Sequence, residues 1–279
     1  MPQAVETIIA RCLIEPGFLG KPRAANESLA QADFGPADLE KIRRFAGFIC
    51  KVKHNHLWGL FPATRRLICH YGIELDIFTK YRLEHDPRAF NAGIESVDDR
   101  LISFINFLDA HFSSHGSSYP YPMLLEVLRH ERFIWETRLV PIAPAVQPMS
   151  SDDLQASRWI DFQRLVVGLD PSLRLFGFHY DVQSIAAQLE EANLEDEIPR
   201  GSERVLAYYF DRHSDAVRVV EVDPITTQLL SLINGKRSVR RVIFASRVLG
   251  LGHARPVEFR EFFEDAHRFG LIKLSPERM

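Results

Sequence analysis

Apolar and polar residues alternate through residues 205–222, and this alternation constrains the fold more than any other feature. The run VLAYYFDRHSDAVRVVEV contains a central cluster of Asp, Arg, His and Ser, which is typical of the turn of an antiparallel hairpin. From Pro224 the apolar spacing becomes helical, with breaks at residues 234–235 and 250–256. We therefore predict two strands, then three helices, then a short closing strand at residues 271–274.

The rest of the chain divides into a helical half and a continuation of this sheet. Residues 173–180, within DPSLRLFGFHYDV, are rich in aromatic residues and are predicted as the first of three strands. The N-terminal half has helical apolar stripes, and three prolines within residues 141–148 indicate a linker. We predict an α+β protein, with an α-helical bundle at 1–150 and a winged-helix-like domain of three antiparallel strands and three helices at 151–279.

Composition restricts the class of protein. The chain has 279 residues, 46% of them hydrophobic and 25% charged, with a formal net charge of -3. Such a balance argues against a protein that binds nucleic acid through overall charge. Cys12, Cys50 and Cys69 show no CxxC spacing, which suits a reducing compartment. With no long apolar run and no secretory signal pattern, we expect a cytoplasmic protein without a membrane span.

The sequence offers little that could carry catalysis. Residues 54–56 spell His-Asn-His, and His111 and His115 are four residues apart, but neither pattern has the further ligands that a metal site needs. Phosphate-binding loops, nucleophile elbows and zinc-protease motifs are missing from the sequence. We therefore expect no catalytic residue, metal ligand or cofactor in this chain, and no enzyme activity on its own.

The sequence supports a binding function better than a catalytic one. No Asp or Glu occurs between Pro224 and Val257, a window that contains six basic residues, so an anionic surface such as DNA phosphate or an acidic peptide could bind there. If the strand at 217–222 lies at a sheet edge, its free backbone groups could pair with an extended peptide. The predicted peptide-binding residues are Val217, Arg218, Val219, Val220, Glu221, Arg237, Arg240, Arg241, Arg255, Phe259, Phe262 and Phe263.

Two segments carry a resemblance to a known module. VRVVEVDPITTQLLSLINGKRSV, followed by FREFFEDAHRFGLIKL, resembles the PqqD-like recognition element of ribosomally made peptide biosynthesis. The resemblance implies that the leader of a precursor peptide is captured as an added strand, against the third strand and the third helix of the module. By position these are residues 217–222 and 256–269.

A second set of segments extends the resemblance to most of residues 60–274. LFPATRRLICHYGIELDIFTKYRLEHDP, YPYPMLLEVLRHERFIWE and DPSLRLFGFHYDVQSIAAQLEEA are similar to the partner proteins of the multinuclear iron-dependent oxidases. In that family the iron belongs to a TIM-barrel subunit, and the partner protein binds the barrel and the precursor peptide. The TglI-like branch, from 3-thiaglutamate biosynthesis, matches better than the MbnC-like branch, from methanobactin biosynthesis, because the chain is long and its recognition element looks complete.

The resemblance implies a substrate-recognition subunit that presents the C-terminal cysteine of a carrier peptide to the oxidase for excision of its β-carbon. Candidates on the helical bundle for the face toward the barrel or the cysteine are Arg65, Arg66, Tyr81, Arg82 and His85. A DNA-binding transcriptional regulator and an MbnC-like partner, which would serve cysteine-to-oxazolone and thioamide modification, stay open as alternatives. An isolated enzyme is a third possibility.

Overall fold

The computed structural model describes residues 10–11, 36–84, 97–140, 150–195, 197–211, 214–250 and 255–276. The fold is α+β, with helices and two small three-stranded antiparallel sheets. It divides into two compact units, of which unit 1 comprises residues 1–132 and 183–195, and unit 2 comprises residues 133–182 and 196–279. These boundaries differ from the single division at residue 150 that was predicted from the sequence. Most of the predicted linker and His85 lie outside the described residues.

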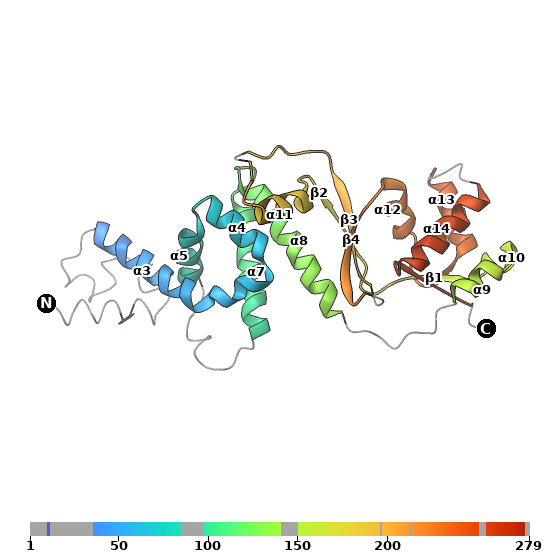
Figure 1. The fold of residues 1–279 in the computed structure, drawn as a ribbon, viewed down its shortest axis with the longest axis horizontal. Helices are drawn as coiled ribbons and strands as arrows, with labels where there is room; N and C mark the ends of the chain where they lie inside the picture. Colours follow the sequence, from blue (N-terminus) through green and yellow to red (C-terminus); the bar gives the residue numbers. More distant parts are fainter. Residues whose placement is uncertain are drawn as a thin grey trace. The chain divides into compact units, whose positions relative to one another are not determined.

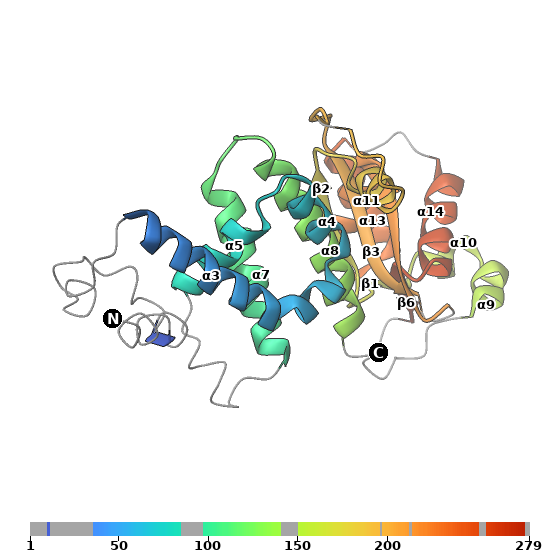
Figure 2. The ribbon, with the colours of Figure 1, turned by 60° about the vertical axis from the view of Figure 1, so that its left-hand side comes forward.

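Unit 1 is helical, as the N-terminal apolar stripes predict. Its elements are α3 (Pro36–His54), the 3-10 helix η2 (Asn55–Leu60), α4 (Pro62–His70), α5 (Glu74–Glu84), α7 (Val97–Ser114), most of α8 (Tyr121–Leu139) and α11 (Val182–Glu190). Figure 2 shows α3 beside α5, and α5 beside α7.

Aromatic side chains fill the core of unit 1. The ring of Trp58 lies edge-on to Phe104 at 5.1 Å between centroids, and Phe78 stacks on Phe104 at 5.4 Å. Gly47 lets α3 approach α5, because a Cβ atom there would lie 2.9 Å from Thr79 Cα. The close contact of these two helices therefore depends on a residue without a side chain.

Two antiparallel sheets distinguish unit 2. One has the order β5-β1-β6, from β1 (Val166–Leu169), β5 (Arg237–Ser238) and β6 (Ile272–Ser275). The other has the order β2-β3-β4, from β2 (Arg174–Phe178), β3 (Arg204–Asp211) and β4 (Ala216–Val222). The predicted strand at 173–180, the hairpin and the closing strand are all present. β1, β5 and the sheet that they form with β6 were not predicted, because strands of four and two residues are too short to show a recognisable alternation.

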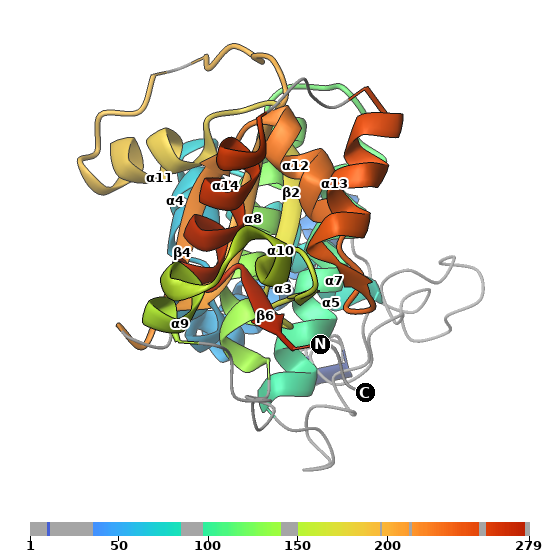
Figure 3. The same ribbon diagram turned by 90° about the vertical axis from the view of Figure 1, so that its right-hand side faces the viewer.

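Three helices follow the β2-β3-β4 sheet, namely α12 (Pro224–Ser231), α13 (Val239–Val248) and α14 (Pro256–Arg268). They lie on one side of that sheet (Figure 1), and α14 stands in front of it in Figure 3. Tyr209 and Leu175 of the sheet pack into the same apolar core as Leu230 of α12 and Phe263 of α14. Phe133, from the last turns of α8, contacts Tyr208 on the opposite face at 5.5 Å between ring centroids.

Two short helices, α9 (Ser151–Ala156) and α10 (Trp159–Phe162), precede β1 and complete unit 2. Arg260 of α14 donates to the carbonyl oxygens of Leu154 and Gln155 at 2.9 and 3.1 Å, which ties α9 to α14. Within the described ranges, none of the helices is both long enough and apolar enough to cross a membrane.

Candidate peptide-binding edge

The strand predicted to receive a peptide lies at the edge of its sheet. β4 pairs antiparallel with β3, in a register that runs from Val205 opposite Val222 to Asp211 opposite Ala216, and among the described residues it pairs with no other strand. In an antiparallel pair, alternate residues of an edge strand point both their N–H and C=O groups away from the neighbouring strand. The backbone of β4 therefore offers donors and acceptors to a further strand.

Side chains of β4 alternate between the two faces of the sheet. Arg218 and Val220 are exposed and lie on the same face as the buried Val222. Val217 and Val219 are half-buried on the other face. Arg218 pairs with Asp211 of β3 at 3.3 Å. A strand added beside β4 would meet alternating apolar and charged side chains, which is the arrangement that gives sequence preference in strand addition.

Glu221 is held by a neighbouring arginine of the sheet. Arg204 Nε donates to Glu221 Oε2 at 3.1 Å, and the same guanidinium pairs with Asp181. These hydrogen bonds from Arg204 hold the pKa of the exposed Glu221 carboxyl below its usual range. Glu221 is therefore ionised, but its charge is already balanced by Arg204. It would attract a basic side chain of an incoming peptide less strongly than an unpaired carboxylate.

The four predicted arginines have different surroundings. Arg237 lies in β5 and is half-buried, with Nη1 donating to Leu232 O at 3.1 Å, so it closes the turn after α12. Arg255 donates from both its backbone N and its Nε to the Glu258 carboxylate at 2.8 Å, before α14 begins. Arg240 and Arg241 are exposed in the first turn of α13. Arg255 is exposed as well, but its guanidinium pairs with Glu258.

The predicted aromatic anchor is not at the surface. Phe259 is 2% exposed and Phe263 is fully buried; both belong to the core of unit 2, and the ring of Phe263 lies 6.5 Å from that of Phe162. Phe262 is partly buried against the same core. The prediction that Phe259 and Phe263 contact a peptide is therefore wrong for this conformation, because α14 turns the side of its helix that carries them toward the core.

The candidates on unit 1 do not form one surface either. Arg66 is exposed and Arg65 half-buried on α4, but Tyr81 of α5 is fully buried, with its ring 5.0 Å from that of Phe104. Arg82 is 7% exposed. Tyr81 and Arg82 were predicted to face a partner, and that prediction is wrong for this conformation because the core side of α5 carries both.

Glu131 is a buried carboxylate that no sequence motif indicates. Glu131 of α8 accepts hydrogen bonds from Ala63 N at 2.8 Å, Thr64 N at 2.9 Å and Thr64 Oγ1 at 2.7 Å. Burial raises the pKa of Glu131 above its ordinary value, although these hydrogen bonds oppose the shift. Helix α4 begins after Phe61, which supplies no side-chain cap, so Glu131 takes over that structural role.

Histidines gather at the end of α7. His115 stacks on Tyr121 at 3.7 Å between ring centroids, and His111 Nδ1 lies 3.2 Å from Lys80 Nζ. Burial, together with the charge of Lys80, lowers the pKa of His111 to about 4. Within the part of the chain that the structure describes, no group of three or more His, Cys, Asp or Glu side chains is placed to hold a metal ion.

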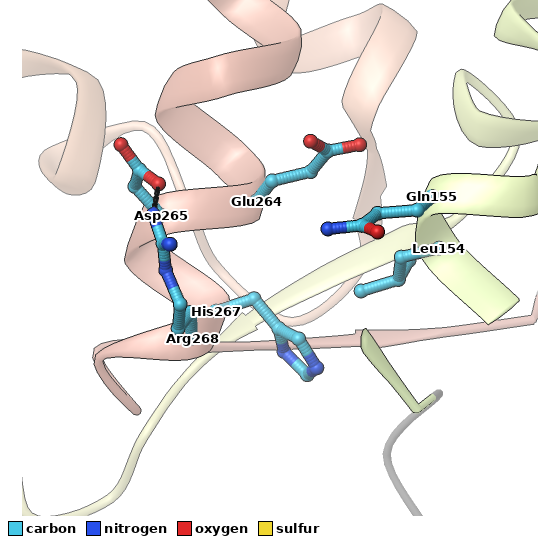
Figure 4. A pocket seen from close by; sticks show the side chains of 6 residues that line it. All are labelled: Leu154, Gln155, Glu264, Asp265, His267 and Arg268. Carbon is cyan, nitrogen blue, oxygen red and sulfur yellow. Dashed lines mark hydrogen bonds and ion pairs between the residues drawn. The ribbon is translucent and has the colours of Figure 1, made fainter. Parts of the chain in front are cut away.

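A polar hollow of about 200 Å³ lies between α9 and the end of α14 (Figure 4). Its lining residues are Leu154, Gln155, Glu264, Asp265, His267 and Arg268. Glu264 pairs with Arg260 at 2.7 Å, and Asp265 pairs with Arg268. Because both of its carboxylates are already paired with arginines, this hollow is a weaker candidate for a ligand site than the edge of β4.

Comparison with known proteins adds no assignment. No protein family model matches the chain, and a search of the curated proteins finds no match to it.

Proposed function

We propose that this chain is the substrate-recognition subunit of a complex that modifies a ribosomally made peptide. In this proposal, β4 binds the leader of the precursor as an added strand, and a separate TIM-barrel subunit holds the iron and performs the oxidation. The free edge of β4 is the observation that carries the proposal. The strands β2, β3 and β4, with α11 between the first two, precede the helices α12, α13 and α14, with the two-residue strand β5 between the first two helices. This order supports a winged-helix module of the PqqD-like type.

Binding at an edge strand can be specific without a deep pocket. The backbone supplies hydrogen bonds that any peptide can use, and the exposed side chains of the strand select among peptides. Val220 and Arg218 are the exposed positions on the face that packs against α12–α14. With Phe259 and Phe263 in the core, apolar contacts to the leader would come from the valines of β4.

The physical benefit of such a subunit is an increase in local concentration. Capture of a leader tethers the other end of the peptide near the oxidase, and short flexible tethers give effective concentrations of order mM. The oxidase would then need only weak affinity for the residue that it modifies. In a TglI-like system that residue is the C-terminal cysteine of the carrier peptide, and in an MbnC-like system it is a cysteine that is converted to oxazolone and thioamide.

The first test is capture of the tagged full-length chain from its native organism, followed by mass spectrometry. We expect an iron-containing barrel protein and a short precursor peptide to copurify. The proposal fails if neither is found while the chain binds duplex DNA with a steep dependence on salt, because that behaviour belongs to the alternative, a winged-helix regulator. The exposed Arg240 and Arg241 are the features that favour this alternative.

A second test separates the free edge from the paired edge of β4. Successive residues of a strand point their N–H groups in opposite directions, so one of Val219→Pro and Val220→Pro removes an N–H from the β3–β4 ladder and the other removes one from the free edge. We expect the variant that loses an N–H of the β3–β4 ladder to be destabilised. The variant that loses an N–H of the free edge should keep its unfolding free energy and lose affinity for the captured peptide at least tenfold. Equal affinity in that stable variant would contradict strand addition at β4.

A further inference from the structure

Helix α13 leaves an apolar ridge in solvent. It buries Val239, Val242, Ile243 and Ser246, which follow one another at helical spacing. Phe244 and Val248 occupy the opposite side, four residues apart, and each is 70% exposed. Residues at this spacing are neighbours on a helix surface, so the two side chains form one continuous ridge.

Arginines stand on both sides of the ridge. Arg240 and Arg247 lie toward one flank of Phe244 and Arg241 toward the other, as the 3.6-residue period of the helix requires. All three are exposed, and among the described residues none forms an ion pair with an acidic side chain. The guanidinium of Arg247 also lies over the ring of Phe259 of α14, at 5.9 Å from its centroid.

We propose that this α13 face, made of Arg240, Arg241, Phe244, Arg247 and Val248, docks an acidic amphipathic helix of a partner protein. An apolar ridge fits the groove between side chains of a second helix. Glutamates or aspartates along the edges of that helix would meet the arginines on both flanks. Aromatic and arginine side chains contribute most strongly to protein interfaces when water is excluded around them, and here they are grouped on one helix face.

Charge and apolarity together decide among the possible occupants. Duplex DNA could pair its phosphates with the arginines, but it offers no apolar surface to the ridge that lies between them. An interfacial membrane helix has its cations on the face opposite its apolar side chains, whereas α13 carries both on the same face. An acidic amphipathic helix satisfies the ridge and its flanks at once. This proposal stands apart from strand addition at β4 and holds whether or not β4 binds a peptide.

The test uses the full chain and a synthetic fluorescein-labelled helical peptide with leucines at i, i+4 and i+7 and glutamates on both flanks. We expect binding by fluorescence anisotropy that weakens as salt increases. Phe244→Ser should lower the affinity at least tenfold, and Arg240→Glu with Arg241→Glu should lower it similarly and remove most of the salt dependence. Phe48→Ser, at a half-exposed phenylalanine of α3 in unit 1, is the matched control and should bind as the wild type does.

Several results would overturn the proposal. The first is a dissociation constant for the acidic peptide weaker than about 1 mM, or one that Phe244→Ser leaves unchanged. The second is tighter binding to labelled duplex DNA, or to vesicles that contain phosphatidylserine, through the same arginines. The third is a self-association of the chain that Phe244→Ser abolishes, since the face would then be an interface between two copies. The Val219→Pro and Val220→Pro variants should bind this peptide normally if they fold, which separates the two proposals.

Discussion

The hydroxyl oxygen of Ser172 accepts a hydrogen bond from the backbone N–H of Phe210 at 3.0 Å. The same hydroxyl donates to Asp170 Oδ1 at 2.7 Å, and Asp170 Oδ2 lies 3.2 Å from Lys273 Nζ. Ser172 lies between β1 and β2, Phe210 lies in β3 and Lys273 in β6, so these contacts join the two sheets of unit 2. They fix the position of the β3–β4 hairpin, and with it the proposed edge, against the rest of that unit.

Replacement of Ser172 should therefore destabilise unit 2. Ser172→Ala leaves the Phe210 N–H without its acceptor and removes one donor from Asp170, at a cost of about 2 kcal/mol in the free energy of unfolding, measured by urea denaturation. Ser231→Ala is the control, because that hydroxyl is exposed and donates to Gln228 O within α12. An equal loss in both variants would show that Ser172 has no special role.

The contact between Glu131 and Thr64 gives a second prediction. Thr64→Val should cost about 1 kcal/mol and Glu131→Gln about 2 kcal/mol, because the amide has one acceptor oxygen where the carboxylate has two. The double variant should cost less than the sum of the single variants, by about 1 kcal/mol, since both remove the hydrogen bond from Thr64 Oγ1. Full additivity of the urea-unfolding energies would show that this bond contributes nothing.

Gly47 permits a third test, of the approach between α3 and α5. Gly47→Ala places a Cβ atom 2.9 Å from Thr79 Cα and 3.0 Å from Thr79 N, so the two helices must separate, at a cost of about 2 kcal/mol in stability. Gly59→Ala, in η2, meets no atom within 4 Å and should leave the melting temperature unchanged or slightly raised. A neutral Gly47→Ala would mean that α3 moves away without loss.

Burial of His130 gives a fourth prediction, which concerns pH. Burial lowers the pKa of His130 from 6.5 to about 4, so the unfolded chain takes up a proton between these values and the folded chain does not. The stabilising contribution is full above pH 6.5 and is lost as pH falls to about 4. The loss is about 3 kcal/mol, because one pKa unit corresponds to about 1.4 kcal/mol.

Comparison of variants isolates the contribution of His130, because His111 titrates in the same range. In His130→Gln, the fall in unfolding free energy between neutral pH and pH 4 should be smaller by that amount. His56→Gln, at an exposed position in η2, is the control for replacing a histidine by glutamine. Identical pH profiles for wild type and His130→Gln would contradict a buried, neutral His130.

The sequence by itself determined most of the local structure. The alternation through residues 205–222 predicts the β3–β4 hairpin, and helical spacing predicts α12–α14 and the helices of unit 1. These elements are predictable because alternation and helical period are properties of neighbouring residues. The sequence also shows that residues 224–257 contain no acidic side chain. The surface of α13 is therefore basic whichever of its sides is exposed.

Only the tertiary structure decided which surfaces are free. Whether β4 is an edge or a central strand depends on which strand lies beside it, and β1 joins β5 and β6 although both follow it by a long stretch of chain. Phe259, Phe263, Tyr81 and Arg82 are buried, while Phe244 is exposed. Periodicity places side chains on one side of an element, but the packing of distant elements decides whether that side meets the core or water.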